Sequence, residues 1–428
     1  MSATREREFL ERLYGTAVAA AHPDNCLPAQ LPAPPPAGRL IVLAAGKGAG
    51  SMTDVAERHY RGAVADRIEG LAVTRHGYGR PTQQIPVIEA GHPVPDAAGL
   101  AATERALAIA HGAGADDLVL VLLSGGASAN WIAPAAGLSL AEKQALTRAL
   151  LRSGASIGEI NTVRKHLSRI KGGRLARHAH PARVVTLAIS DVPGDDPAVI
   201  GSGPTVPDPT TLVDARAVLD RYRIELPANV LRALGDPANE TPKPDDPLFA
   251  ATEFRLVARP ADAFRAAEAA VHAAGYTCAP LGEHLEGEAR TVAQAHAGFA
   301  RNLQAQGLRA VILSGGEFTV TIRGQGRGGP NQEYALALAL ALDAAPGIAA
   351  LAADTDGADG GIGRPDDPAG AFIDPTTLSR ARALGLDPAV FLAENDSTEF
   401  FSRLGDLVTP GPTFTNVNDF RAILVDRA

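Results

Sequence analysis

The sequence predicts an α/β protein made of two domains, each built on a mainly parallel, Rossmann-like sheet. Three continuous apolar runs carry this prediction: Leu40–Ala44, Leu118–Leu123 and Val184–Ile189. Runs without polar alternation suit strands that are buried on both faces, as in parallel sheets. Each run leads into a polar or glycine-rich turn, and helical patterns lie between the runs. This alternation of strand, turn and helix is typical of α/β proteins.

A proline- and acid-rich segment, residues 223–250, is the predicted domain boundary. Strand and helix patterns resume after it, with Phe254–Ala258 and Ala261–Ala274. We therefore expect an N-terminal domain at residues 1–240 and a C-terminal domain at residues 250–428. The alternating segment YALALALALD lies in the second domain, and we expect a helix there because alanine and leucine are strong helix formers.

The composition narrows the class of the protein. With 428 residues, of which 46% are apolar and 21% charged, the chain can form sizeable cores. Its formal net charge of −8 provides no basic field for a nucleic-acid partner. Cys26 and Cys278 form no CxxC pair, which fits a reducing compartment and excludes a cysteine zinc site. Because neither a signal peptide nor an 18-residue apolar run is present, we expect a cytoplasmic protein without a membrane span.

A lysine-containing glycine loop follows the first apolar run. The loop reads Gly46-Lys47-Gly48-Ala49-Gly50-Ser51-Met52. Its glycine spacing fits neither the dinucleotide fingerprint nor the P-loop. A lysine among backbone N–H donors suits phosphoryl oxygens, so Lys47 is a candidate catalytic residue. The alternative is a solvated surface lysine beside a tight turn.

Two similar segments place a polar turn after an apolar run, one in each half of the chain. The first continues LVLLSGGAS and the second AVILSGGEF. Ligands of open α/β sheets bind at the carboxyl ends of strands. The candidate substrate- or phosphate-binding residues in the first half are Ser124, Gly125, Gly126 and Ser128. The candidate nucleotide-binding residues in the second half are Ser314, Gly315, Gly316 and Glu317, together with Asn331 and Asp356.

The second segment continues into a glycine-rich loop, Gly324–Gly329, which ends where a helix with Asn331 as its N-cap is expected. Glycines let backbone N–H groups approach a ligand that a Cβ would keep away. A phosphate-handling loop is one interpretation. A glycine-rich hairpin without a ligand is the other, and the local sequence does not separate them.

A basic segment, Asn161–Lys171, stands out in this acidic chain. If it is helical, Asn161, Lys165 and Ser168 share one face, and Arg164 and Lys171 share another. A local cationic cluster suggests an anionic ligand such as a carboxylate or a phosphate. A solvated basic helix would explain the same pattern.

Aspartates follow two of the expected strands. Asp191 comes almost directly after Val184–Ile189, and DTDGADG follows Ile348–Ala353. Carboxylates at strand ends suit a general base or a Mg²⁺ ligand. Turns capped by aspartate are the alternative for such residues.

Taken together, the motifs resemble the class II glycerate kinase family over nearly the whole chain. In the first half these are AAGKGAGSM, EAGHPVPD, LLSGGAS, EINTVRKHLSRIKGGRLA and SDVPGDDPAVIGSGPT. In the second half ILSGGEFTVTIRGQGRGGPNQE, DTDGADG and TNVNDF resemble the family's MOFRL domain. Each motif alone is weak, but their number and order are specific.

The resemblance implies phosphorylation of D-glycerate to 2-phosphoglycerate with ATP and Mg²⁺, in a cleft between two α/β domains. It implies that Lys47 contacts the transferring phosphate and that Asp191 is the base for the glycerate hydroxyl and a candidate metal ligand. Asn161, Arg164 and Lys165 would line the substrate or phosphate site. A homodimer is compatible with the sequence, which does not specify the oligomeric state.

Two positions depart from the family pattern. Pro330 stands where the family commonly has an arginine, so Arg327 is expected to supply that charge as a catalytic residue. Asn130-Trp131 replaces small aliphatic residues after the first Ser-Gly-Gly, a change that could alter the acceptor pocket.

Two other functions fit parts of the sequence. Relatives in tartrate metabolism have carried the name hydroxypyruvate reductase, and Arg75–Gly79 resembles them. The chain lacks a G-x-G-x-x-G with a following ribose-binding acid, so a nicotinamide site has no usual support. A nucleotide-binding regulator would keep the glycine loops without Lys47 and Asp191, yet both residues are present.

Overall fold

The computed structural model describes residues 3–360 and 366–427. The chain divides into two compact units. The central unit is Cys26–Val257, and the flanking unit consists of Met1–Asn25 and Ala258–Ala428. Within the described ranges, no helix is both long and apolar enough to cross a membrane.

The central unit is built on a six-stranded sheet with the strand order β3-β2-β1-β4-β5-β6. Its strands are β1 (Leu40–Ala45), β2 (Ile68–Arg75), β3 (Val87–Ala90), β4 (Leu118–Leu123), β5 (Arg183–Ile189) and β6 (Thr252–Ala258). The neighbouring pairs from β3 to β5 are all parallel. The apolar runs of the sequence form β1, β4 and β5, whose side chains are almost entirely buried. The expected parallel sheet is therefore confirmed in this unit.

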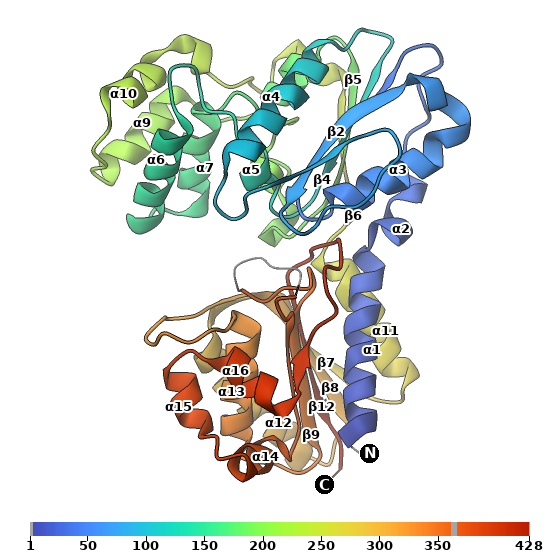
Figure 1. Ribbon diagram of the computed structural model, residues 1–428, viewed down its shortest axis with the longest axis vertical. Helices are drawn as coiled ribbons and strands as arrows, with labels where there is room; N and C mark the ends of the chain where they lie inside the picture. The colour runs from blue at the N-terminus through green and yellow to red at the C-terminus, as the bar shows by residue number, and fades with distance from the viewer. Residues whose placement is uncertain (1–2, 361–365, 428) are drawn as a thin grey trace. The chain divides into compact units, whose positions relative to one another are not determined.

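Helices surround this sheet, and four of them form a separate cluster. The helices are α3 (Ala49–Val64), α4 (Ala97–His111), α5 (Ala127–Asn130), α6 (Leu140–Arg152), α7 (Ile157–His166), α8 (Arg174–Ala179), α9 (Leu212–Arg221) and α10 (Ala228–Gly235). The short helix α2 (Pro23–Cys26) spans the point where the chain passes from the flanking unit into the central one. Helices α6, α7, α9 and α10 share a core of their own that includes Leu150, Val163 and Leu219. They stand together at one side of the unit (Figure 1).

The flanking unit contains a second six-stranded sheet, in the order β11-β10-β9-β12-β8-β7. Its strands are β7 (Thr277–Glu288), β8 (Ala310–Thr319), β9 (Ile348–Asp354), β10 (Gly370–Ile373), β11 (Leu407–Val408) and β12 (Asp419–Val425). Only β7 and β8 pair in parallel among its described strands, so the expectation of a mainly parallel second sheet is wrong. Two strands reverse the direction: β12 lies between β8 and β9 and runs antiparallel to both, and β10 lies between β9 and β11 and runs antiparallel to both.

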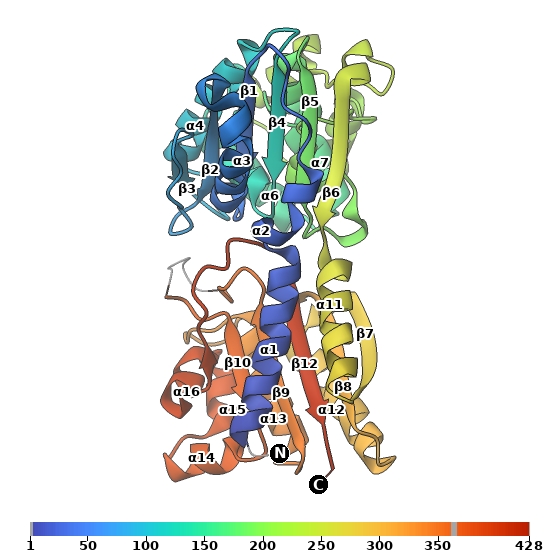
Figure 2. The ribbon, with the colours of Figure 1, turned by 90° about the vertical axis from the view of Figure 1, so that its right-hand side faces the viewer.

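Helices cover both faces of this sheet. They are α1 (Ala3–Ala21), α11 (Pro260–Ala273), α12 (Ala289–Ala305), α13 (Pro330–Leu342), α14 (Thr377–Ala383), α15 (Pro388–Ala393) and α16 (Ser397–Leu404). Helices α1 and α11 lie side by side on one face, as Figure 2 shows. Helices α12 and α13 pack on the other face in one core with Ile312, Ala350 and Ile423. The YALALALALD segment is helical as predicted, and most of α13 is buried.

Helix α1 belongs to the flanking unit, whereas the sequence predicts that residues 1–240 form one domain. The Tyr14 hydroxyl donates to the Asp354 carbonyl (2.9 Å), and the Arg7 guanidinium donates to the Gly405 carbonyl (3.0 Å). The Phe9 and Tyr276 rings stack with their centroids 5.5 Å apart. The apolar face of α1 therefore covers a sheet formed more than two hundred residues later in the chain.

Candidate active site

The sequence-predicted residues of the first half meet at one edge of the central sheet. Ala45 of β1 is in register with Leu123 of β4, and Leu123 is in register with Ala188 of β5. These strands are parallel, so the segments that follow them leave the sheet at the same edge. Lys47, the Ser124 turn and Asp191 therefore lie at neighbouring strand ends, as predicted.

The lysine loop and the first Ser-Gly-Gly turn hold each other in place. The backbone N–H of Lys47 donates to the Gly125 carbonyl (2.8 Å), and the N–H of Gly48 donates to the Ser124 hydroxyl (2.8 Å). A Cβ at Gly46, whose φ is +116°, would overlap Ser124. These contacts fix the backbone from which the Lys47 side chain extends. In them the Ser124 hydroxyl acts as the acceptor of the Gly48 N–H.

Gly126 allows the chain to turn from β4 into helix α5. Its φ is +87°, and a Cβ there would lie 2.9 Å from the His92 ring and 3.5 Å from the Lys47 side chain. The turn thus brings His92 and Lys47 close to the start of α5. Asp191 follows β5 and is half-buried, and the Ser190 hydroxyl shapes its segment by accepting from the Val192 N–H (3.2 Å).

The basic segment is not one continuous helix. Helix α7 ends at His166, and the chain then turns, with the Ser168 hydroxyl accepting from the N–H groups of Ile170 and Lys171 (both 3.3 Å). The expected shared face of Asn161, Lys165 and Ser168 is therefore wrong, because the helix is shorter than the cationic pattern.

Its charged side chains have different environments. The Lys165 ammonium lies 3.5 Å from the Asp208 carboxylate, and both side chains are almost fully buried. Lys165 is thus held in an internal ion pair. Arg164 is half-buried, and within the described ranges no side chain or carbonyl accepts from its guanidinium. Burial alone lowers the pKa of Arg164.

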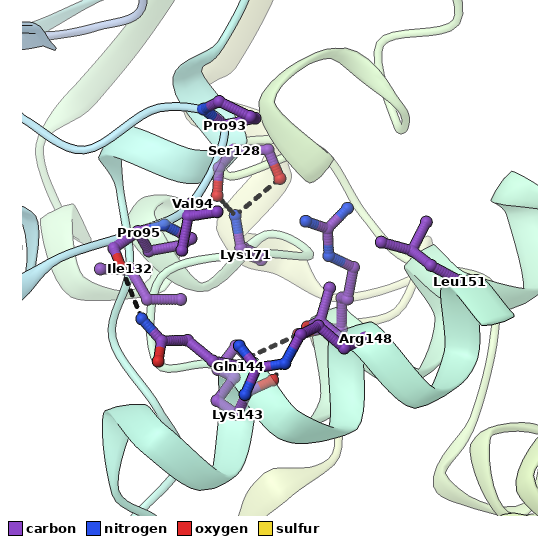
Figure 3. A pocket seen from close by; sticks show the side chains of 12 residues that line it. Pro93, Val94, Pro95, Ser128, Ile132, Lys143, Gln144, Arg148, Leu151 and Lys171 are labelled. Atoms are coloured by element: carbon purple, nitrogen blue, oxygen red, sulfur yellow. Dashed lines mark hydrogen bonds between the residues drawn. The ribbon is translucent and has the colours of Figure 1, made fainter. Parts of the chain in front are cut away.

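A pocket of about 300 Å³ lies beside these residues in the central unit. Figure 3 shows the Lys171 ammonium among its lining residues, donating to the Ser128 carbonyl (2.6 Å) and hydroxyl (2.9 Å). Arg164 and Lys143 also line the pocket. Neither Lys143 nor Lys171 is among the site residues that the sequence predicts. The sequence signal for Lys171 is its place in the basic segment, whereas Lys143 lies outside every motif singled out above.

The Asn130-Trp131 dipeptide does not line this pocket. Trp131 is 1% exposed and belongs to the apolar core under the sheet, while Asn130 is completely buried. Ile132 is the neighbour that contributes to the lining. The Trp131 side chain therefore does not contact this pocket, and an effect of Asn130-Trp131 on the acceptor stays a prediction.

The second Ser-Gly-Gly is part of a strand and not a turn. Ser314, Gly315 and Gly316 lie inside β8 and pair with Arg421, Phe420 and Asp419 of β12. A Cβ at Gly316 would overlap the backbone of Leu285, and one at Gly315 would lie 2.7 Å from the Phe264 ring. These glycines permit close packing with β7 and α11. Glu317 follows as an exposed strand residue.

The glycine-rich loop packs against the segment before α16. Cβ atoms at Gly324, Gly326 and Gly328 would overlap Glu394, Asp396 and Ser397 respectively. Loop N–H groups donate to this segment, including Arg323 to the Asn395 side chain (2.7 Å) and Arg327 to the Asp396 carboxylate (3.0 Å). These donors are already used within the protein. The Arg327 side chain is exposed and borders a second pocket of about 630 Å³.

Asn331 is not the N-cap of α13. Gly329 is at the cap position, Pro330 begins the helix, and the buried Asp359 carboxylate accepts from the N–H groups of Asn331 (2.9 Å) and Gln332 (2.8 Å). The Asn331 side chain donates to Asp359 (3.2 Å) and Asp419 (2.7 Å). Asp356 accepts from the Ala358 N–H (2.8 Å) in the turn after β9. A nucleotide-binding role for Asn331 and Asp356 stays a prediction, as does a cleft between domains.

Two family models match the chain. One is described as a domain of unknown function (DUF4147) and covers residues 9–235, and the MOFRL family covers residues 310–419. A D-glycerate 2-kinase from Thermotoga maritima is 40% identical over 387 residues, 89% of each chain. The crystal structure of a glycerate kinase from the same organism has a TM-score of 0.86 at 37% identity, and the match covers 99% of this chain and 100% of that one. This chain belongs to the class II glycerate kinase family.

A protein from Agrobacterium vitis whose provisional name is hydroxypyruvate reductase is also similar. It is 48% identical over 425 residues, 98% of this chain and 94% of that protein. Glycerate kinase family members therefore carry names from two enzyme classes.

Pro330, which departs from the family pattern, has a structural role in this chain. It occupies the first turn of α13, where proline lacks an N–H that the helix does not need.

Proposed function

We propose that this protein transfers the γ-phosphoryl group of ATP to D-glycerate and produces 2-phosphoglycerate and ADP. The family relatives named D-glycerate 2-kinase and glycerate kinase support this reaction. The observation that carries the proposal is the interlock of the Lys47 loop with the Ser124 turn, beside a pocket lined by cations. Phosphoryl transfer requires positioning and charge neutralisation more than covalent chemistry, and this arrangement provides both.

The proposed roles follow from the chemistry of each group. The Lys47 ammonium stabilises the charge on the transferring phosphoryl oxygens. Asp191 accepts the proton of the C2 hydroxyl while that oxygen forms a bond to the γ-phosphorus and the bond to the ADP oxygen breaks. Arg327 is proposed to neutralise charge on the nucleotide phosphates.

Magnesium is part of the proposal because ATP chemistry requires neutralisation of phosphate charge. Within the described part of the chain, no group of three or more His, Cys, Asp or Glu residues could hold a metal ion. Mg²⁺ usually binds through one or two carboxylates together with substrate phosphates, so a single carboxylate such as Asp191 fits this mode. When bound, Mg²⁺ would neutralise phosphate charge.

The alternative, NAD(P)H-dependent reduction of hydroxypyruvate, has less support. A ribose-binding acid of an NAD site follows the second strand of the fold. Here β2 ends at Arg75, whose guanidinium stacks 4.6 Å from the Tyr78 ring centroid. The glycine loop after β1 also does not have the spacing of the dinucleotide fingerprint, and it carries Lys47, which suits phosphoryl oxygens.

The deciding experiment supplies purified protein with ATP, Mg²⁺ and D-glycerate and measures ADP formation. Enolase without phosphoglycerate mutase converts the product to phosphoenolpyruvate only if it is 2-phosphoglycerate. A parallel assay follows NADH oxidation with hydroxypyruvate. ADP formation with a product that enolase accepts is expected, and Asp191→Asn should lower turnover by about 10²–10⁴-fold. NADH oxidation without ADP formation would overturn the proposal.

A further inference from the structure

The pocket of about 300 Å³ lies between two parts of the central unit. One wall is the segment Pro93–Pro95, and the opposite wall is helix α6 with Lys143 and Gln144. Gln144 donates to the Pro95 carbonyl (2.6 Å) and ties the walls together, as Figure 3 shows. Much of the lining is apolar, with Val94 and Ile132 among its residues. Such walls suit a ligand that has a carbon skeleton.

The charges that line this pocket all have one sign. Its cationic residues are Lys143, Arg148, Arg164 and Lys171, and no Asp or Glu among the described residues lines it. Lys143 is 5% exposed and Lys171 is 1% exposed. A protein with a net charge of −8 has thus gathered cations, two of them buried, around one cavity.

Several other cations of the chain have carboxylate partners. Lys165 pairs with Asp208, Arg290 pairs with Glu333 (2.6 Å), and Arg421 pairs with Asp419. This agrees with the cost of burying an uncompensated charge. Among the described residues, neither Lys143 nor Lys171 has a carboxylate partner, and they share this with the buried Arg174, which donates to the Asn239 carbonyl (2.5 Å). What sets the pocket apart is that four cations line it together without an acidic residue among the described residues.

The two buried lysines of the pocket donate to neutral oxygens and not to carboxylates. Lys143 donates to the carbonyls of Arg164 (3.2 Å) and Leu167 (2.5 Å) at the end of α7, where the helix dipole favours a positive charge. Among the described residues, the Lys171 ammonium donates only to the neutral oxygens of Ser128. Burial and the nearby charges of Arg164 and Lys143 lower the pKa of Lys171. An anion between Arg164 and Lys171 would relieve this repulsion.

The pocket also adjoins the phosphoryl-transfer edge of the sheet. Its Pro93 wall continues directly from His92, whose ring lies against Gly126 near Lys47. Its Ser128 wall is two residues beyond Gly126. A small acid in the pocket could therefore present its hydroxyl group toward the Lys47 loop.

We propose that this pocket binds the carboxylate of the acceptor acid, with the Arg164 guanidinium and the Lys171 ammonium as its direct contacts. The identity of the acid as D-glycerate rests on the proposed function, whereas the recognition of a carboxylate does not. Arginine presents paired N–H donors that match the two oxygens of a carboxylate, and the Lys171 ammonium adds a second positive charge. The pocket thereby selects hydroxy acids over neutral polyols such as glycerol.

The test measures binding of D-glycerate, glycerol and inorganic phosphate by calorimetry, and KM and kcat for D-glycerate. Arg164→Gln and Lys171→Met are compared with Arg152→Gln, which removes an exposed arginine of α6 that does not line the pocket. Loss of a charged hydrogen bond is expected to weaken D-glycerate binding and raise KM by roughly 10–100-fold. Arg164→Lys should restore part of the affinity. Circular dichroism melts identify any variant that fails to fold, and Arg164, which is only half-buried, keeps the test informative.

The outcomes separate this inference from the proposed function. Weakened D-glycerate binding in Arg164→Gln, with Arg152→Gln unchanged and glycerol not bound, supports the inference even if no ADP forms. Unchanged D-glycerate affinity and KM in a folded Arg164→Gln overturn it, even if the enzyme is an active kinase. Phosphate binding that is lost in Arg164→Gln while D-glycerate binding persists would also overturn it and assign the pocket to phosphate.

Discussion

The two Ser-Gly-Gly segments of this chain have nearly the same sequence context and different structures. After β4, Ser124–Gly126 leaves the sheet and leads into α5, with Gly126 in the left-handed region. In the second half, Ser314–Gly316 continues as strand β8. Both segments follow continuous apolar runs, so local sequence does not decide between turn and strand.

The difference arises from the neighbouring strands. β4 lies between parallel strands that end at the same level, and its chain turns at Ser124 to meet the Lys47 loop. β8 lies beside β12, whose residues Asp419–Arg421 extend the pairing along all of Ser314–Gly316. The segment Ser124–Gly126 therefore lies outside the strand pairing and beside the Lys47 loop, whereas Ser314–Gly316 pairs with β12 along its whole length.

Lys47→Ala is the strongest test of the chemical side of this comparison. Loss of an ammonium group from a phosphoryl site should lower kcat by about 10³-fold, because the charge that develops in transfer loses its stabilisation. The thermal midpoint should stay nearly unchanged, since the Gly46–Gly48 backbone keeps its hydrogen bonds. Steady-state kinetics and a thermal melt check this, with Arg61→Ala of α3 as an exposed control. Activity near that of the wild type would remove Lys47 from the mechanism.

Gly316→Ala tests whether the second Ser-Gly-Gly segment serves the packing of the flanking sheet. The new Cβ would overlap the backbone of Leu285, and φ at this position is +90°, so unfolding free energy should fall by about 2–4 kcal/mol. Gly126→Ala also introduces a side chain at positive φ, but its nearest neighbour is the His92 side chain, which can move. Urea unfolding should show the larger loss for Gly316→Ala, and kinetics the larger loss for Gly126→Ala. The reverse ranking would contradict the assignment of the two segments.

Asp359→Asn tests how the stability of the flanking unit depends on pH. Burial, with the nearby charge of Asp419, raises the pKa of Asp359 to about 7, although donors from α13 oppose this shift. The folded-state pKa lies above the ordinary value of 3.8, so ionisation destabilises the fold. This destabilisation is absent below about pH 4, grows as pH rises and is complete above about pH 7.

The measurement is urea unfolding of both proteins across this pH range. Relative to Asp359→Asn, the wild type should lose stability as pH rises. Asp387→Asn, which alters an exposed capping aspartate of α15, controls for the loss of a cap. Parallel stability curves for wild type and Asp359→Asn would show that the carboxylate is not perturbed.

Arg327→Ala should have the smallest effect. The side chain is exposed, and the backbone bond to Asp396 does not depend on it, so stability should be unchanged. If the arginine neutralises nucleotide charge, KM for ATP should rise by less than about tenfold, as is usual for solvent-exposed charges. Arg323→Ala, in the same loop and also exposed, is the matched control. Equal kinetics in both variants would make this loop structural only.

The elements that the sequence predicts correctly are those with a local signal. Apolar runs identify β1, β4 and β5, and the leucine and alanine content identifies α13. Residues that act on a distant segment escape such prediction. Asp359 caps a helix that begins nearly thirty residues earlier, and Lys171 reaches Ser128, 43 positions away. No periodicity in the sequence records such contacts.

The N-terminal helix illustrates the same limit in another way. Its apolar positions, including Phe9, Leu10 and Leu13, form one buried face and recur with helical spacing in the sequence. An amphipathic pattern shows that a face is buried but not which sheet receives it. The antiparallel insertion of β12 into the second sheet escapes prediction for a similar reason, since strand order depends on pairing across the whole unit.

The position of α1 has a consequence for biosynthesis. The central unit is in effect an insertion within the flanking unit, because the chain starts in the flanking unit, leaves it at Asn25 and returns at Ala258. During translation the apolar face of α1 is synthesised before the central unit, whereas β12 is synthesised after it. The central unit can fold as soon as it leaves the ribosome, in keeping with domain-wise folding during synthesis. The apolar face of α1 therefore has no β12 to pack against until the whole central unit has been synthesised.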